Sequence, residues 1–433
     1  MTIGTLGDRI GRRRLLLIGA ASFGVASVVA ALSTSAEMLI VTRALLGIAG
    51  ATLAPSTLSL IRVMFRDPEE RRVAIGVWIA SFSAGAAVGP ILGGLLLQYF
   101  WWGSVFLIGV PVMVLLLVLG PMVLPEYRDP AAGRQDWISA GLSLASVIST
   151  IYGVKRLAVD GANWPAIGAI GLGLLIGWAF VRRQSRIADP MIELRLFRIP
   201  AFSASLGTFV AFGVFVFIGQ HLQLVLGMNP LRAGLWTAPF AAAFIVGSMV
   251  TPWIAQHIAP ARIVAAGLAV AAMGFALLSR IESSSGPLFL ATAFVIYSLG
   301  LAPVFTLATD VVVNSVPEEK AGAASALSET CSELGGALGI AILGSIGTAV
   351  YRADVSDSVT RALPSEAAQV MRSTLGAALE VAHRMGVATG APLVETLREA
   401  FVQGFRVSAV VAAATMLLAA VVFVAAMRRA QTS

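Results

Sequence analysis

Charged residues and cysteine are scarce in this chain, and each shortage excludes a class of protein. Asp, Glu, Lys and Arg make up 12% of the 433 residues, whereas soluble domains carry about 25%. Cys331 is the one cysteine, so neither an internal disulfide nor a cysteine-rich metal cluster can form within the chain. The three histidines lie far apart in the sequence, which does not favour a zinc site. We therefore expect no metal.

Apolar residues, in contrast, make up 58% of the sequence. The formal net charge is +7, but the arginines gather in short loops, as the charge bias of membrane proteins requires, so nucleic acid is not an implied partner. A spanning helix needs about 20 apolar residues, and about twelve runs approach that length. We place them near Leu15 to Leu32, Leu39 to Ile61, Val73 to Leu97, Val105 to Leu124, Trp137 to Val154, Pro165 to Val181, Ala201 to Leu226, Gly234 to Ala255, Ile263 to Leu278, Pro287 to Val313, Ala321 to Val350 and Val407 to Met427. The sequence thus predicts an all-α polytopic membrane protein.

The basic loops predict the orientation of these spans. Arginines are concentrated in the loops on one side of the membrane, which that bias assigns to the cytoplasm, so both ends of this chain face the cytoplasm. The connection from Tyr351 to Gln403 then lies outside. Its recurring Ala, Leu and Val predict an amphipathic helical hairpin, with an unstructured loop as the alternative.

Two carboxylates stand in the small-residue run from Ala321 to Gly344. Glu329 and Glu333 are four residues apart, so on a helix they share one face. An acid at membrane depth is costly and marks a polar cavity, a partner or an ion path. The alternatives are a helix lying on the membrane surface, or acids that neighbouring hydroxyls satisfy. Asp310, near the cytoplasmic end of its span, is a third candidate acid, although an acid solvated at the interface fits equally well.

The stretch from Gly4 to Arg14 is a tight basic loop in which glycines permit turns. Its order, G-x-L-G-D-R-x-G-R-R, resembles the signature loop of the major facilitator superfamily. The positions that match are Gly4, Gly7, Asp8, Arg9, Gly11 and Arg12.

Arg43 lies near the start of a span, where a guanidinium needs a buried acceptor or a route to the interface. Its surroundings, R-A-L-L-G-I-A-G-A, are similar to the superfamily's second motif, in which this arginine is associated with proton transfer. An arginine that only orients the span is the alternative.

A third motif, G-x-x-x-G-P-x-x-G-G, repeats glycine every four residues and adds a proline that bends its helix. It consists of Gly85, Gly89, Pro90, Gly93 and Gly94. Packing alone explains such glycines, yet the order resembles the antiporter motif of drug:proton exporters.

Residues 189–197 and 221–234 resemble stretches typical of the fourteen-span drug:proton antiporter family, and the run at Glu329 resembles its quaternary-ammonium efflux subgroup. In that family the Gly-Asp-Arg loop follows the second span, whereas here it begins at residue 4, so we expect the first two spans to be missing. The expected regions are 1–124, a truncated N-terminal bundle with family spans 3–6; 125–183, two central extra spans; 184–200, a cytoplasmic linker; and 201–433, a six-helix C-terminal bundle with the external loop 351–403.

The resemblance implies a monomeric transporter, not an enzyme, in the cytoplasmic membrane. It would export lipophilic, cationic drugs in exchange for protons, with the proton gradient as energy source and no cofactor. Two carboxylates one turn apart repel each other, which favours a shared proton or a bound cation between them. Phe209, Phe212, Phe215, Phe217, Trp236 and Phe240 either line the cavity or, more simply, pack or face lipid. The alternatives are a truncated, non-transporting membrane protein, or an importer of a small organic solute.

Overall fold

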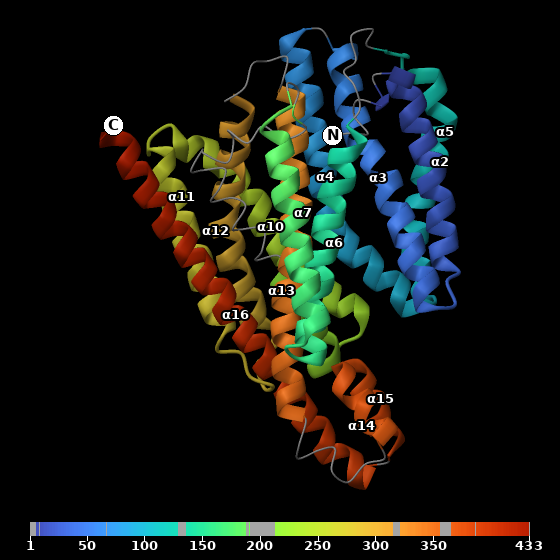
Figure 1. Ribbon diagram of the computed structural model, residues 1–433, viewed down its shortest axis with the longest axis vertical. Helices are drawn as coiled ribbons and strands as arrows, with labels where there is room; N and C mark the ends of the chain where they lie inside the picture. The colour runs from blue at the N-terminus through green and yellow to red at the C-terminus, as the bar shows by residue number, and fades with distance from the viewer. Residues whose placement is uncertain are drawn as a thin grey trace. The chain divides into compact units, whose positions relative to one another are not determined.

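The computed structural model describes residues 6–7, 9–65, 67–128, 136–187, 190, 213–314, 321–355, 365–385 and 387–432, and every regular element in these ranges is a helix (Figure 1). Among the described residues, 10 helices are long and apolar enough to cross a membrane. Two shorter apolar helices, Val88–Tyr99 and Gly213–Val225, lie where the sequence predicts two further spans. The all-α polytopic fold with about twelve spans is thus confirmed.

The chain divides into two compact units, and each is described by itself. Unit 1 consists of Met1–Ala140, Pro230–Leu235 and Val316–Leu327; unit 2 consists of Gly141–Asn229, Trp236–Ser315 and Ser328–Ser433. The region boundaries expected from the sequence, at residues 124, 183 and 200, stay a prediction.

Unit 1 is built from the first helices of the chain, which are α2 (Arg12–Ala31), α3 (Ala36–Met64), α4 (Pro68–Tyr99), the 3-10 helix η1 (Trp102–Ile108) and α5 (Gly109–Val123). Ser35 caps α3 by accepting a hydrogen bond from the Met38 amide at 3.1 Å, which satisfies one of the free N–H groups of the first turn. Ala26, Ala30 and Leu46 form a buried cluster between α2 and α3, against which Phe106 of η1 packs. The core of this unit therefore lies along α2.

Unit 2 holds the remaining helices, except for the first residues of three of them. The helices are α6 (Trp137–Asp160), α7 (Trp164–Gln184), α9 (Gly213–Gln220), the π-helical turn η4 (His221–Val225), α10 (Pro230–Ala255), α11 (Pro260–Leu278), α12 (Pro287–Asn314), α13 (Ala321–Val355), α14 (Ser365–Ser373), α15 (Leu375–Arg384) and α16 (Val387–Thr432). The three whose first residues belong to unit 1 are α6, α10 and α13. α10, α11 and α12 each begin at a proline, which suits the first helical position because its amide hydrogen has no partner there. α11 packs along both α12 and α16, so the best-buried part of unit 2 lies around α11.

The described parts of the connection between residues 351 and 403 are mostly helical, which confirms the predicted helical pattern there. They consist of the end of α13, the short helices α14 and α15 and the start of α16 (Figure 1). The Tyr351 hydroxyl donates to the Met371 carbonyl at 3.0 Å, and Met371 and Leu375 are buried. α16 has 46 residues, so at 1.5 Å per residue it is about 69 Å long, more than twice the roughly 30 Å of a bilayer core. Part of α16 therefore extends beyond a bilayer core.

Candidate functional site

The helix that carries the two predicted acids is continuous. α13 runs unbroken from Ala321 to Val355, so Glu329 and Glu333 lie one turn apart on one face, as the sequence predicts. The Glu333 side chain is exposed. The side chains of Glu329 and Asp310 lie outside the described part of the structure, and their roles stay predictions.

Small residues let another helix approach α13 beyond these acids. The backbone of α9 meets α13 where Gly213 faces the Gly339 carbonyl, so that a Cβ on Gly213 would collide with it. Further along, the Ser408 hydroxyl of α16 donates to the Leu343 carbonyl of α13 at 3.0 Å. α9, α13 and α16 therefore form a close-packed group, with Glu333 on the same helix about 9 Å before Gly339.

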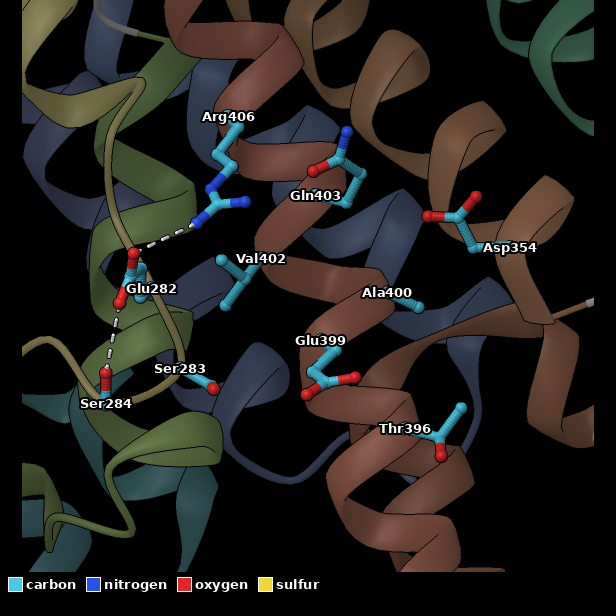
Figure 2. Close-up of a pocket in the computed structure, with 10 residues that line it drawn as sticks. All are labelled: Glu282, Ser283, Ser284, Asp354, Thr396, Glu399, Ala400, Val402, Gln403 and Arg406. Atoms are coloured by element: carbon cyan, nitrogen blue, oxygen red, sulfur yellow. Dashed lines mark hydrogen bonds and ion pairs between the residues drawn. The ribbon is translucent and has the colours of Figure 1, made fainter.

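A pocket of about 510 Å³ opens at the other end of α13, beside the start of α16 (Figure 2). Its lining residues come from the turn between α11 and α12, from the end of α13 and from α16: Glu282, Ser283, Ser284, Asp354, Thr396, Glu399, Ala400, Val402, Gln403 and Arg406. Arg406 donates to the Ile281 carbonyl, and its guanidinium lies 4.0 Å from the Glu282 carboxylate. The sequence motifs gave no sign of this pocket, because its residues come from segments far apart in the chain.

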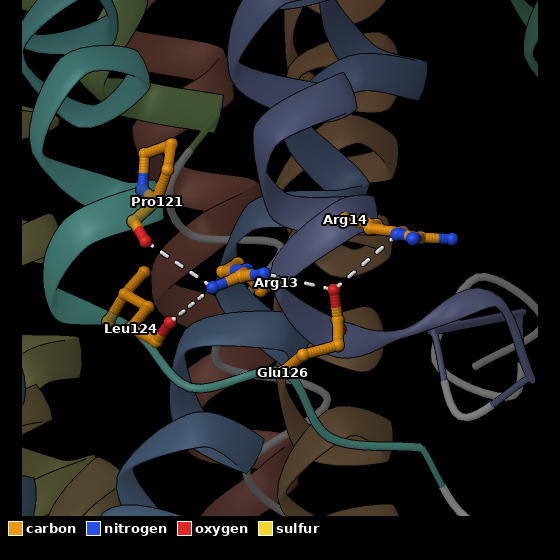
Figure 3. Close-up of polar contacts among 5 residues, drawn as sticks. All are labelled: Arg13, Arg14, Pro121, Leu124 and Glu126. Atoms are coloured by element: carbon orange, nitrogen blue, oxygen red, sulfur yellow. Dashed lines mark hydrogen bonds and ion pairs between the residues drawn. The ribbon is translucent and has the colours of Figure 1, made fainter.

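The signature loop holds the end of α5 in unit 1 (Figure 3). Arg13 donates from Nη1 to the Leu124 carbonyl at 3.0 Å and to the Pro121 carbonyl at 3.3 Å. These carbonyls end a helix, where they have no partner in the helix and where a cation is favoured. The Arg12 amide donates to the Tyr127 carbonyl at 2.9 Å. The loop thus joins the start of α2 to the segment after α5.

The acidic partner of the loop arginines is Glu126, which the sequence motifs did not indicate. Its carboxylate lies 3.7 Å from both Arg13 and Arg14, although its two oxygens are shielded from solvent and form no hydrogen bond within the described residues. It packs on Gly11, whose φ of 112° is open to glycine but strained for other residues. A Cβ on Gly11 would collide with this carboxylate.

Two constraints therefore favour glycine at position 11: its backbone conformation and the Glu126 carboxylate packed against it. Among the other loop positions, Gly7 is buried, Arg9 is exposed, and Gly4 and Asp8 lie outside the described residues.

The glycine motif on α4 divides into two parts. A Cβ on Gly94 would lie 2.5 Å from the Pro230 carbonyl, and a Cβ on Gly234 would lie 2.5 Å from the Pro90 carbonyl. The start of α10 therefore crosses α4 at backbone contact, as the motif predicts. A Cβ on Gly85, Gly89 or Gly93 would meet no described atom within 4 Å, so these three form an open stripe on α4.

Arg43 lies near the turn that joins α2 and α3, at the other end of α2 from the signature loop. Its side chain is exposed, and its guanidinium carbon is 5.7 Å from the centre of the Phe106 ring. Such a contact gives the cation a favourable face without a carboxylate. The described contact of Arg43 in this conformation is thus with an aromatic ring, and its role in proton transfer stays a prediction.

An aromatic cluster in unit 2 contains Phe215 and Phe240 from the predicted aromatic set. Phe240 packs on Phe294 at 5.7 Å and on Tyr297 at 5.4 Å between ring centres, and Tyr297 stacks on Phe275 at 4.7 Å. The members from α11 and α12 are not in the predicted set, since lone aromatic residues in apolar spans carry no distinguishing pattern. Phe209 and Phe212 lie outside the described residues.

This helical architecture and its signature loop agree with a family model. The Major Facilitator Superfamily model matches residues 1–340. The chain belongs to this superfamily. It is accordingly a membrane transporter, and the resemblance drawn from its motifs is confirmed at this level.

Curated relatives match nearly the whole chain of this superfamily member. It is 44% identical, over 99% of its length and 86% of the relative's, to the multidrug efflux pump LfrA of Mycolicibacterium smegmatis. It is 33% identical, over 98% of its length and 80% of the relative's, to a tetracenomycin C resistance and export protein of Streptomyces glaucescens. It is 32% identical, over 97% of its length and 86% of the relative's, to the methyl viologen resistance protein SmvA of Salmonella typhimurium.

Solved structures share its fold at low sequence identity. A bacterial homologue of the human lysosomal transporter Spinster, inward-facing and occupied, aligns with a TM-score of 0.61 at 16% identity, covering 96% of this chain and 82% of that one. An auto-inhibited peptide transporter of the POT family aligns with a TM-score of 0.62 at 14% identity, covering 99% and 84%. These likenesses support the fold alone.

Proposed function

We propose that this superfamily member exports lipophilic, cationic compounds across the cytoplasmic membrane in exchange for protons. The observation that carries the proposal is the 44% identity, across nearly the entire chain, to a protein named as a multidrug efflux pump. A relative named for methyl viologen resistance adds support for cationic substrates, because methyl viologen is an organic dication. The fourteen-span subfamily remains part of this proposal.

The exchange takes place at Glu329 and Glu333 on α13. A carboxylate binds either a proton or an organic cation, and binding of one displaces the other. With the site open to the cytoplasm, the ionised acids take up the cation. With the site open to the outside, a proton displaces the cation, and the protonated site returns. One turn of helix between the acids lets them share the bound charge.

The exposure of Glu333 supports this role, since an acid that must exchange its ligand needs access from a water-filled space. The close approach of α9 at Gly339 fixes α13 just beyond the acid. Asp310 and Arg43 serve as further coupling residues in the proposal. The Arg43 contact with Phe106 leaves its guanidinium free of any described carboxylate in this conformation.

Substitution of the acids tests the proposal in energised cells loaded with ethidium. Glu333→Gln and Glu329→Gln keep the size and polarity of the side chain but remove its charge and its titration. Each is expected to lose most of the ethidium efflux. Glu395→Gln is the matched control, because Glu395 is an exposed acid on α16 outside the site, and it should retain full efflux. Proton-dependent efflux that is unchanged in both α13 variants would contradict the assignment of the exchange site to Glu329 and Glu333.

A further inference from the structure

A buried histidine in unit 2 has the Ser285 backbone beside its ring, but neither ring nitrogen forms a hydrogen bond of normal geometry within the described residues. This residue, His221, is 0% exposed. Buried polar atoms are nearly always paired, so a buried imidazole without such a hydrogen bond needs an explanation. The proposed exchange at α13 does not use this ring.

The backbone at His221 is unusual as well. His221 begins η4, a single π-helical turn that ends α9, and such turns are rare and frequently occur at functional sites. The Leu224 carbonyl in this turn accepts a hydrogen bond from Arg398 Nε of α16 at 3.2 Å. The Leu226 amide donates to the His221 carbonyl at 3.0 Å, across five residues. The turn is therefore a local departure from the α-helix that α16 helps to hold.

The ring occupies the end of an aromatic column between α9 and α16. Phe217, one turn before His221, stacks on Phe405 with 5.6 Å between ring centres and packs on Phe401 at 6.0 Å. His221 meets Phe405 edge-on at 6.1 Å. All three phenylalanines are buried. A neutral imidazole fits this column as a fourth ring, whereas burial among these rings disfavours the charged imidazolium.

The elements that bury the ring also line the pocket shown in Figure 2. Val402 and Arg406 stand on either side of Phe405 in α16 and belong to the pocket lining. The turn between α11 and α12 contributes Glu282 to the pocket, and its Ser285 backbone lies next to the histidine ring. The aromatic column and the pocket therefore share their walls.

The pocket contains carboxylates that a protonated imidazole can pair with, whereas the aromatic column is made of uncharged rings. The pocket is lined by the carboxylates of Glu282, Asp354 and Glu399, and an opposite charge within a few ångströms favours the charged form of a histidine. α9 and η4 carry no charged residue. The titratable and charged residues on the elements around the ring are Arg280 and Glu282 on the turn, Arg352 and Asp354 on α13, Glu380, His383 and Arg384 on α15, and Glu395, Arg398, Glu399 and Arg406 on α16.

We propose that His221 is a pH-sensitive positioning residue with two sites, neutral in the aromatic column and protonated against the carboxylates of the pocket. Movement between the two requires η4 to separate from Phe405. Protonation therefore favours the separated arrangement, because a ligand shifts a conformational equilibrium toward the state that binds it better. Acid on the side of the membrane predicted to be external would loosen the contact between α9 and α16. The inference goes beyond the proposed transport, since it needs neither a substrate nor a proton gradient.

Hydrogen exchange of the purified protein in detergent tests the proposal. Exchange in peptides covering residues 213–229 is measured between about pH 7.5 and 5.5, where an imidazole changes its charge, and is corrected for the pH dependence of chemical exchange. The wild type is expected to open more as the pH falls, by up to about tenfold per pH unit, because opening is linked to the uptake of one proton. His221→Phe keeps a ring in the column and should abolish the response.

The other two histidines supply the matched control. His257 and His383 are exposed, so the double variant His257→Phe/His383→Phe should keep the full response. His221→Gln replaces the ring by an uncharged polar group and should also be unresponsive, which keeps the test decisive if His221→Phe fails to fold. A response that persists in the His221 variants, or that is absent from the wild type, would overturn the proposal. Loss of ethidium efflux would bear on the proposed function and not on this result.

Discussion

The signature-loop end of unit 1 and the pocket end of unit 2 are both held by arginine–carbonyl hydrogen bonds. They differ in the ionisable group beside these bonds, which is an acid at the first end and a histidine at the second. In both, an arginine from one helix donates to carbonyls at the end of another: Arg13 to Leu124, and Arg398 to Leu224. At the first end the ionisable group is the half-buried Glu126, which lies between two arginines. At the second it is His221, which lies among phenylalanines with the Ser285 backbone beside its ring.

The two ends differ in what controls their contacts: shape and charge pairing at Glu126, and protonation in the proposal for His221. Glu126 has two arginines beside it and fits against Gly11, so the contact there depends on shape and charge pairing. Protonation of a buried imidazole is costly, so in our proposal the contact at His221 depends on pH. Substitutions at the first end should therefore act on stability. Those at the second should change local opening.

The largest effect is expected at Gly11, because its place under Glu126 leaves no room for a side chain. Gly11→Ala adds a collision with the carboxylate to the cost of a positive φ, and we expect a loss of about 3 kcal/mol in the free energy of unfolding. Gly161 is the matched control, with φ 75° and open space around its Cβ. Gly161→Ala should cost about 1 kcal/mol. Denaturant titration in detergent measures both, and equal losses would contradict the fit at Gly11.

A smaller and more local effect is expected in the helical hairpin of unit 2. Met371 is 0% exposed, whereas its neighbour Val370 is 39% exposed. Met371→Ala should destabilise α14 and α15 by about 2 to 3 kcal/mol, which corresponds to protease cleavage within residues 365–385 that is about 30- to 160-fold faster. Val370→Ala should leave the cleavage rate within about twofold of the wild type. Similar acceleration in both variants would show that the hairpin has no packed core.

The smallest effect is expected from replacing the two arginines beside Glu126, which differ in their contacts with α5. Arg13 and Arg14 both lie 3.7 Å from Glu126, but their side chains are 30% and 64% exposed, and only Arg13 has a described hydrogen bond to the end of α5. Arg13→Gln should cost about 1.5 kcal/mol of unfolding free energy. Arg14→Gln should cost about 0.5 kcal/mol or less, since exposed ion pairs contribute little. Equal costs would mean that attraction to Glu126, and not the carbonyl contacts, holds the loop to the end of α5.

The sequence predicts some residues of each site but not the partners that distant segments supply. The loop motif identified Gly11 and Arg12, and apolar run lengths predicted the spans, because both depend on neighbouring residues. Glu126 escaped notice since it follows a different span and becomes a partner only when α5 folds back beside α2. His221 was noted as part of a family-like stretch, but nothing local marks a π turn or an aromatic column supplied by α16. The helical pattern of the hairpin was readable, whereas the pocket beside it depends on three segments that meet only in the fold.

The central claim, exchange of protons for organic cations, is tested most directly by following both in one vesicle. The purified protein is reconstituted into proteoliposomes that contain a pH-sensitive dye, and ethidium is added on one side without an imposed pH gradient. The account predicts that ethidium movement in one direction drives protons in the other, and that Glu333→Gln abolishes both movements together. Ethidium transport with no accompanying pH change, in a vesicle that holds its pH, would contradict it.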